Sequence, residues 1–250
     1  YREQGLVTKV RASTRPDAVR PGHLAALRQA GLDMLELGVQ SFHDIPLAAS
    51  NRGYGSDQAL DGCGLVRESG LELGIQLMPG MPGMEPEDFR RDLDQTVALA
   101  PAAVRLYPCL VLAGTGLATR YERGEFAPWS QEKTLPLLAG AQLAFWRAGI
   151  PVIRIGLAPQ DSLDGGGILA GPAHPALGSL VRGLALCRYI KDELARLGVS
   201  GGNIIHLRLP QRFQGEFWGH GGSLETEYAA LGIRRGAISW HDEPHCEVRF

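Results

Sequence analysis

Amide, hydroxyl and guanidinium side chains stand at the ends of several apolar runs in this sequence. Gln40 and Ser41 directly follow the run from Met34 to Val39, and Arg52 comes a dozen residues later. Glutamine donates and accepts hydrogen bonds at once, and arginine can bind a carboxylate through two parallel bonds. The alternative interpretation is a turn capped by Gln40 and Ser41, followed by a solvated surface arginine.

The same kind of residue recurs where other apolar runs end. Backbone beside a glycine can come close to a flat base, because glycine carries no Cβ. Such a set suits a polar small ligand that carries a carboxylate, ribose hydroxyls and a purine. The further candidate ligand-binding residues are Ser13, Gln76, Tyr107, Pro108, Ile155 and Gly156.

Several other chemistries lack their signatures. No pair of carboxylates stands among these run ends, which argues against glycoside hydrolysis. The sequence contains no H-E-x-x-H and no G-x-S-x-G, and the GMPG segment lacks the lysine of a phosphate-binding loop. We expect no metal ligands in this chain, because its cysteines are far apart and form no C-x-x-C pair: Cys63, Cys109, Cys187 and Cys246.

Strands and helices alternate with a spacing of about 30 to 40 residues, which predicts an α/β fold with a parallel sheet. In such folds the ligand lies beyond the carboxyl ends of the strands, so the candidate residues should converge. The expected strands are Val7–Ala12, Met34–Val39, Leu71–Met78, Ala103–Leu112 and Pro151–Leu157, and the expected helices are Pro21–Ala30, Ser56–Ser69, Glu85–Leu99 and Ser130–Ala148.

The glycine-rich DSLDGGG segment divides the chain. We expect a barrel-like domain over residues 1–160, a linker over 161–172 and a small α/β appendage over 173–250. With 44% hydrophobic and 21% charged residues and a net charge of −2, the composition is that of an ordinary globular protein. It does not favour nucleic acid or a membrane surface as partner, although a local basic groove stays open as an alternative, and it predicts reduced thiols and a cytoplasmic location.

Seven segments occur in a fixed order: STRPDAV, LELGVQSFHDIPL, NRGYGSDQAL, LELGIQLMPGMPG, VRLYPCLVLAGTGL, YERGEFAPW and VIRIGL. They resemble the radical S-adenosylmethionine (SAM) superfamily, in the branch akin to the catalytic subunit of Elongator and to oxygen-independent coproporphyrinogen III oxidase. The resemblance implies a partial (βα)₆ TIM-like barrel that binds S-adenosylmethionine and a [4Fe-4S] cluster. It further implies an oxidoreductase or transferase that generates a 5′-deoxyadenosyl radical, which abstracts hydrogen from a substrate of unknown nature.

The resemblance also assigns roles to the candidate residues. Ser13 matches a polar contact at a strand end, Gln40 an amide near the cofactor, and Arg52 the arginine that reaches the cofactor's carboxylate. Gln76 stands where relatives often place an acid that touches the ribose, so that contact is altered here. Two stretches match segments whose backbone lies near the adenosyl group, namely Tyr107-Pro108 and Ile155-Gly156.

One part of the family pattern is missing. The family's C-x-x-x-C-x-x-C cluster motif is not found, so we expect the chain to begin near the third strand, with the cluster ligands upstream and no activity of its own. A competing hypothesis is a non-catalytic barrel remnant that binds a nucleotide-like ligand or a partner protein. A third, an ordinary barrel lyase or aldolase, needs a strand-end lysine that the sequence does not offer.

Overall fold

The computed structural model describes residues 4–157, 166–198, 205–243 and 246–249. The chain forms two compact units, one made of Tyr1–Leu137 with Ala144–Pro175 and the other of Leu138–Leu143 with Ala176–Phe250. The predicted linker 161–172 lies partly outside the described residues, and the predicted domain boundaries stay a prediction. None of the described helices combines the length and the hydropathy that a membrane span requires.

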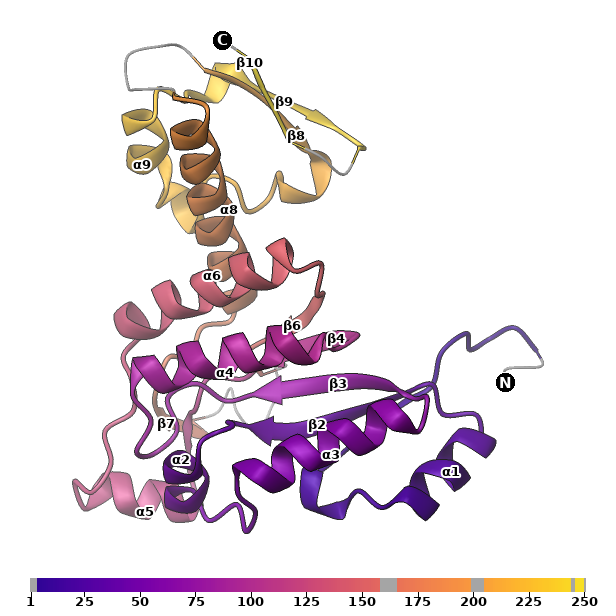
Figure 1. Cartoon of the computed structure of the whole chain (residues 1–250). Helices are drawn as coiled ribbons and strands as arrows, with labels where there is room; N and C mark the ends of the chain where they lie inside the picture. Colours follow the sequence, from indigo (N-terminus) through magenta and orange to yellow (C-terminus); the bar gives the residue numbers. More distant parts are fainter. Residues whose placement is uncertain (1–3, 158–165, 199–204, 244–245, 250) are drawn as a thin grey trace. The chain divides into compact units, whose positions relative to one another are not determined.

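The first unit is built on a parallel sheet whose strands follow one another in chain order (Figure 1). Neighbouring parallel strands need a crossover between them, and helices supply it here. The α/β fold with a parallel sheet is therefore confirmed. The strands, in sheet order, are β1 (Arg11–Thr14), β2 (Met34–Gln40), β3 (Glu72–Leu77), β4 (Ala103–Leu106) and β6 (Val152–Ile155).

Helices α3 and α4 lie along the strands over one face of this sheet (Figure 1). Helix α4 begins with Pro86 in its first turn, where a missing N–H is harmless, and Asp88 Oδ2 accepts from the Glu85 amide at 2.9 Å. It ends at Ala100, which has a left-handed conformation. The helices of this unit are α1 (Pro21–Gln29), α2 (Asp44–Ala49), α3 (Ser56–Glu68), α4 (Pro86–Leu99), α5 (Gly116–Glu122) and the two end segments of α6 (Gln131–Arg147), with a 3₁₀ turn at Pro16–Ala18.

The sheet has one apolar and one polar face, because successive strand residues point to opposite sides. In β2, Leu35, Leu37 and Val39 alternate with Glu36, Gly38 and Gln40. The apolar set suits the face that α3 and α4 cover, since both helices bury apolar side chains. Register then places residues of four strands on the opposite face, through the pairs Ser13 with Glu36, Glu36 with Gly74, and Gln76 with Arg105.

Two predicted strands differ from those observed. The first begins at Arg11 rather than Val7, because the Val10 amide donates to Asp33 Oδ2 at 2.6 Å instead of to a neighbouring strand. The predicted strand Ala103–Leu112 ends at Leu106, since Pro108 has no N–H to continue the ladder. The rest of that segment contributes β5 (Val111–Leu112), which pairs antiparallel with β7 (Ile168–Ala170) in a separate sheet.

The second unit packs helices against a three-stranded sheet in the order β10-β8-β9. Its core contains stacked rings of Phe217 and Tyr228, whose centroids lie 4.1 Å apart, with Trp218 and Trp240 at their edges. Its elements are α8 (Leu177–Arg196), β8 (His206–Pro210), α9 (Glu225–Ala230), β9 (Ile238–His241) and β10 (Glu247–Arg249), with 3₁₀ turns at Gln211–Phe213, His220–Gly222 and Arg235–Ala237.

Candidate functional site

A buried carboxylate organises the polar face of the sheet. Glu36 is 1% exposed. Arg105 Nη2 donates to Glu36 Oε1 at 3.0 Å, and Arg105 Nε lies 2.7 Å from Glu36 Oε2. From the other side, Gln76 Nε2 lies 3.4 Å from both Ser13 Oγ and Glu36 Oε2 and donates to each. The same arginine donates from Nη1 to the Tyr107 hydroxyl at 3.0 Å. We call these five residues the polar network.

The polar network brings together three residues that the sequence predicts, Ser13, Gln76 and Tyr107. The other two, Glu36 and Arg105, were not predicted from the sequence, although they make the ion pair at the centre of the network. Their signal was the alternation within each strand, with a charged residue between apolar neighbours. The Glu36 carboxylate accepts hydrogen bonds from both Arg105 and Gln76. These bonds fix the orientation of the two side chains.

Next to the polar network, Gly38 leaves a gap on the same face of β2. A Cβ built on Gly38 would lie 2.9 Å from Gln40 Nε2, 3.6 Å from the Thr14 carbonyl oxygen and 3.8 Å from Arg52 Nη2. Two donors and one acceptor therefore converge on this gap, which accommodates no Cβ unless the Gln40 amide moves. We call this gap and its surrounding residues, Thr14, Gly38, Gln40, Arg52 and Tyr54, the Gly38 cradle.

Tyr54 holds the arginine of the cradle in place. Its hydroxyl donates to the Gly38 carbonyl at 2.6 Å and accepts from Arg52 Nε at 3.2 Å. Arg52 Nη2 also donates to the Gly38 carbonyl, at 3.3 Å. Burial raises the pKa of the Tyr54 hydroxyl, with the adjacent Arg52 opposing, so the phenol stays protonated and keeps its role as donor.

The cradle contains polar groups that are incompletely satisfied. Gln40 is 7% exposed, and its Oε1 has no hydrogen-bond partner among the described residues. Across the same ranges, no carboxylate forms an ion pair with Arg52. Buried polar atoms normally have partners, so these two side chains are suited to a ligand that offers both a donor and an acceptor.

Arg52 also lines a pocket of about 370 Å³. Its walls come from the end of α2, from the Met78–Pro82 turn after β3 and from α5, and they include the buried Cys109. This volume lies within the range of small-ligand sites, which are mostly apolar with a few polar groups that fix orientation.

The remaining predicted residues lie at the ends of β4 and β6. The Tyr107 amide donates to the Leu77 carbonyl at 2.9 Å, and the Gly156 amide donates to the Leu106 carbonyl at 2.9 Å. Gly156 has φ of 75°, a conformation that favours glycine, and Ile155 is the last residue of β6. Pro108 is buried. These strand ends neighbour the polar network through Tyr107; their ligand contacts stay a prediction.

The described residues do not provide ligands for an iron–sulfur cluster. Within the described ranges, no group of three or more His, Cys, Asp or Glu residues could hold a metal ion. Burial raises the pKa of Cys63 to about 12 and that of Cys109 to about 11, so both remain thiols at neutral pH, whereas a cluster binds thiolates.

Comparison with known families places this geometry in context. Residues 2–96 match the model of the radical SAM superfamily, and residues 101–184 match the model of the radical SAM C-terminal domain. The first match contains β1 to β3 and the Gly38 cradle, and the second contains β4 and β6. The Gly38 cradle and the polar network therefore both lie in segments that match these family models.

Individual relatives agree with the family models. The chain is 33% identical over 132 residues to a tRNA uridine(34) acetyltransferase of Methanocaldococcus infernus, covering 52% of this chain and 25% of that protein. It is 31% identical over 148 residues to human Elongator complex protein 3, covering 56% of this chain and 26% of that protein. The chain thus spans about a quarter of the length of the curated relatives it matches.

A solved structure shares the fold. The archaeal Elp3 of Methanocaldococcus infernus, with its N-terminal residues 1–46 deleted, superposes with a TM-score of 0.60 at 27% identity, covering 76% of this chain and 42% of that chain. The parallel sheet of the first unit thus corresponds to part of a radical SAM TIM-like barrel. The chain belongs to the radical SAM superfamily, in the branch that resembles Elongator complex protein 3.

Proposed function

We propose that the first unit forms part of the S-adenosylmethionine site of a radical SAM enzyme. The observation that carries this proposal is the Gly38 cradle, where the Oε1 atom of the buried Gln40 amide lacks a hydrogen-bond partner and Arg52 forms no ion pair within the described ranges. Family membership supplies the identity of the ligand, and the cradle supplies the residues that fit it.

The chemistry of the cradle matches a ligand with a charged end. Arg52 can bind a carboxylate, because its guanidinium is always protonated and is already oriented by Tyr54. The Gln40 carbonyl oxygen can accept from an ammonium or hydroxyl group, and its amide can donate to an oxygen. The amino-acid end of S-adenosylmethionine carries both a carboxylate and an ammonium group.

The polar network then holds the side chains beside the Gly38 cradle rigid. Arg105 fixes the Tyr107 hydroxyl, and Glu36 fixes Arg105, so these side chains do not reorganise when a ligand binds. Preorganised contacts cost less conformational entropy on binding. We assign binding and orientation to the described residues and no step of the radical chemistry, because they offer no cluster ligands. For the whole protein we propose the family's activity, with a [4Fe-4S] cluster held upstream of Tyr1.

Calorimetric titration of S-adenosylmethionine into the purified protein tests the proposal. Arg52→Ala should weaken binding by about 1.5–3 kcal/mol, or roughly ten- to a hundred-fold, the usual value of a charge-assisted hydrogen bond. Arg90→Ala is the matched control, because Arg90 is an exposed arginine of α4 that pairs with Glu87. Equal affinities of wild type and Arg52→Ala, with both folded, would show that Arg52 does not bind the ligand.

A second titration separates the enzyme from the barrel remnant. Adenosine lacks the carboxylate and the ammonium group. If adenosine bound as tightly as S-adenosylmethionine and Arg52→Ala changed neither affinity, the site would recognise a nucleoside alone. That result would favour the non-catalytic remnant that binds a nucleotide-like ligand.

A further inference from the structure

The turn that follows β2 is strained at Gln40. Gln40 has φ of 69°, a value that residues other than glycine rarely adopt. The Ser41 amide donates to the Val39 carbonyl at 2.9 Å, across this one residue. This pattern is the rarer, strained form of γ-turn, and such conformations persist only where the surroundings hold them.

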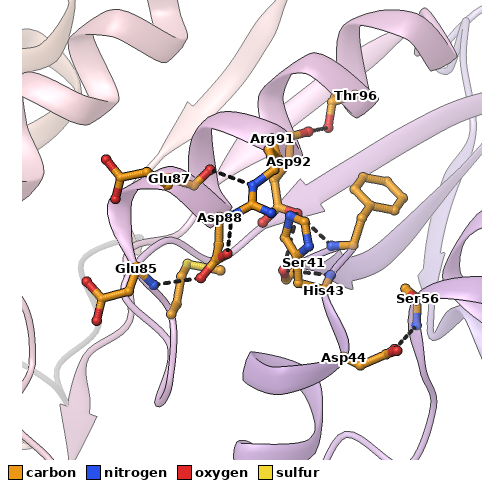
Figure 2. A network of polar contacts seen from close by, with 12 residues as sticks. Ser41, His43, Asp44, Ser56, Glu85, Glu87, Asp88, Arg91, Asp92 and Thr96 are labelled. Carbon is orange, nitrogen blue, oxygen red and sulfur yellow. Dashed lines mark hydrogen bonds and ion pairs between the residues drawn. The ribbon is translucent and has the colours of Figure 1, made fainter.

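Contacts on both sides hold the turn. The Gln40 carbonyl accepts from the Met78 amide, after β3, at 2.9 Å. On the other side, Asp92 of α4 points into the turn (Figure 2), and its Oδ1 accepts from the Phe42 amide at 2.7 Å and from the Ser41 hydroxyl at 3.2 Å. Gln40 and the two residues that follow it are therefore each fixed by a bond to a neighbouring element.

Burying the carboxylate of Asp92 at this position is energetically unfavourable. It is 0% exposed, and burial raises its pKa to about 6, against the bonds from Phe42 and Ser41 and the nearby His43, which lower it. His43 Nε2 lies 3.6 Å from Asp92 Oδ1, and Asp88 on the same helix raises the pKa further. A packed apolar residue commonly stabilises such a site better than a buried charge. The carboxylate therefore serves a purpose other than packing.

We propose that Asp92 is a positioning residue of the ligand site, which holds the Ser41–Phe42 segment so that the Gln40 amide faces the Gly38 cradle. Asp92 itself does not contact the ligand. It acts through two bonds to the turn, and the loss of those bonds lets Gln40 relax to a negative φ and move its amide away from Gly38. The inference rests on the proposed function, because it concerns the same site.

Three variants test the role. Asp92→Ala removes both bonds to the turn. Asp92→Asn keeps a carbonyl oxygen at the place of Oδ1 and so keeps both bonds without the charge. Thr96→Val is the matched control: Thr96 is also 0% exposed on α4, and its hydroxyl donates to the Asp92 carbonyl at 2.7 Å, so its loss removes a buried bond of the same helix away from the turn (Figure 2).

Two measurements are made on the full chain, namely the affinity for S-adenosylmethionine and the hydrogen exchange of the Phe42 amide. Asp92→Ala should lose affinity about ten-fold or more and exchange faster at Phe42. Asp92→Asn should recover most of the affinity, a rescue that a generally loosened helix would not show. Thr96→Val should keep wild-type affinity. If Asp92→Ala does not fold, Ser41→Ala replaces it. This variant removes the bond from the Ser41 hydroxyl to Asp92 and the bond that the hydroxyl accepts from the His43 amide, and a loss of affinity of about three-fold or more is expected.

The outcomes separate the two proposals. Wild-type affinity and wild-type exchange in Asp92→Ala would overturn the positioning role and leave the ligand site standing. Faster exchange at Phe42 with unchanged affinity would show that Asp92 holds the turn but that the turn does not orient the ligand, which also overturns the inference. A wild-type protein that does not bind S-adenosylmethionine would overturn the proposed function instead.

Discussion

Gly38→Ala is the substitution that most sharply separates binding from folding. The added Cβ would lie 2.9 Å from Gln40 Nε2, which is closer than van der Waals contact allows, but that atom is the far end of a flexible side chain. The other neighbours, the Thr14 carbonyl oxygen at 3.6 Å and Arg52 Nη2 at 3.8 Å, stay at ordinary contact distances. The clash is therefore confined to the Gln40 amide.

The expected effect on stability is small. Gly38 does not have a positive φ, so its backbone accepts alanine without strain. Replacing glycine in a compatible conformation stabilises a protein by about 0.4–1 kcal/mol through the unfolded state, which offsets a similar cost of moving Gln40. We expect the free energy of unfolding in urea to change by about 1 kcal/mol or less.

The expected effect on the ligand is large. The methyl group would occupy the gap itself and displace the amide that lines it, so the affinity for S-adenosylmethionine should fall about ten-fold or more, or roughly 1.4 kcal/mol. Gly22→Ala in α1 is the matched control, because nothing lies within 4 Å of its Cβ. A folded Gly38→Ala protein that binds as wild type does would refute the assignment of the cradle.

Three further predictions concern the groups around the cradle. Glu36→Gln leaves Arg105 without its buried partner and should lower the free energy of unfolding in urea by about 3 kcal/mol; the double variant with Arg105→Met should recover part of this loss, and additive losses would contradict the coupling. Tyr54→Phe removes a buried hydroxyl bonded to β2 and should cost about 1–2 kcal/mol in thermal unfolding, so an unchanged melting curve would speak against that contact. Because burial raises the Asp92 pKa from 3.8 to about 6, its contribution to stability is present below about pH 4 and is lost as the pH rises through 6; Asp92→Asn should lack this decline, and identical pH profiles of the two proteins would contradict the shift.

Much of the fold follows from periodicity. The alternation of apolar runs with helical patterns predicted the parallel sheet, and three of its five strands were placed close to their observed positions. The strand Ala103–Leu112 was predicted too long. Its apolar residues continue past Pro108, but Pro108 has no N–H to donate to the neighbouring strand. The short helices α2 and α5 were not predicted, since segments of six or seven residues carry almost no periodic signal.

The site was predicted less completely, and for a physical reason. Residues at strand ends can be recognised in the sequence as polar residues that follow apolar runs. The structure places Gln40 near Arg52, and Ser13 near Gln76. Glu36 lies inside a strand that reads as buried, and only the register with neighbouring strands pairs it with Arg105. Register depends on contacts between segments far apart in the chain, which a single sequence does not display.

The role of Asp92 also depends on contacts between distant segments, which the sequence does not display. In the sequence it is one acidic residue among several on an amphipathic helix, and nothing distinguishes it from the half-buried Asp88 and the exposed Asp94. Its position at the turn arises because α4 passes beside the end of β2, where Asp92 bonds to Ser41 and Phe42. A residue that acts by holding a strained turn is therefore found from the structure and not from the pattern.

The central claim is that Gln40 and Arg52 bind the amino-acid end of S-adenosylmethionine at Gly38. A crystal structure of the protein with S-adenosylmethionine or S-adenosylhomocysteine tests it most directly. The account predicts electron density for the ligand carboxylate within hydrogen-bonding distance of the Arg52 guanidinium, with the Gln40 amide against the ligand. Density for the ligand elsewhere, with the Gly38 gap and both side chains untouched, would contradict it.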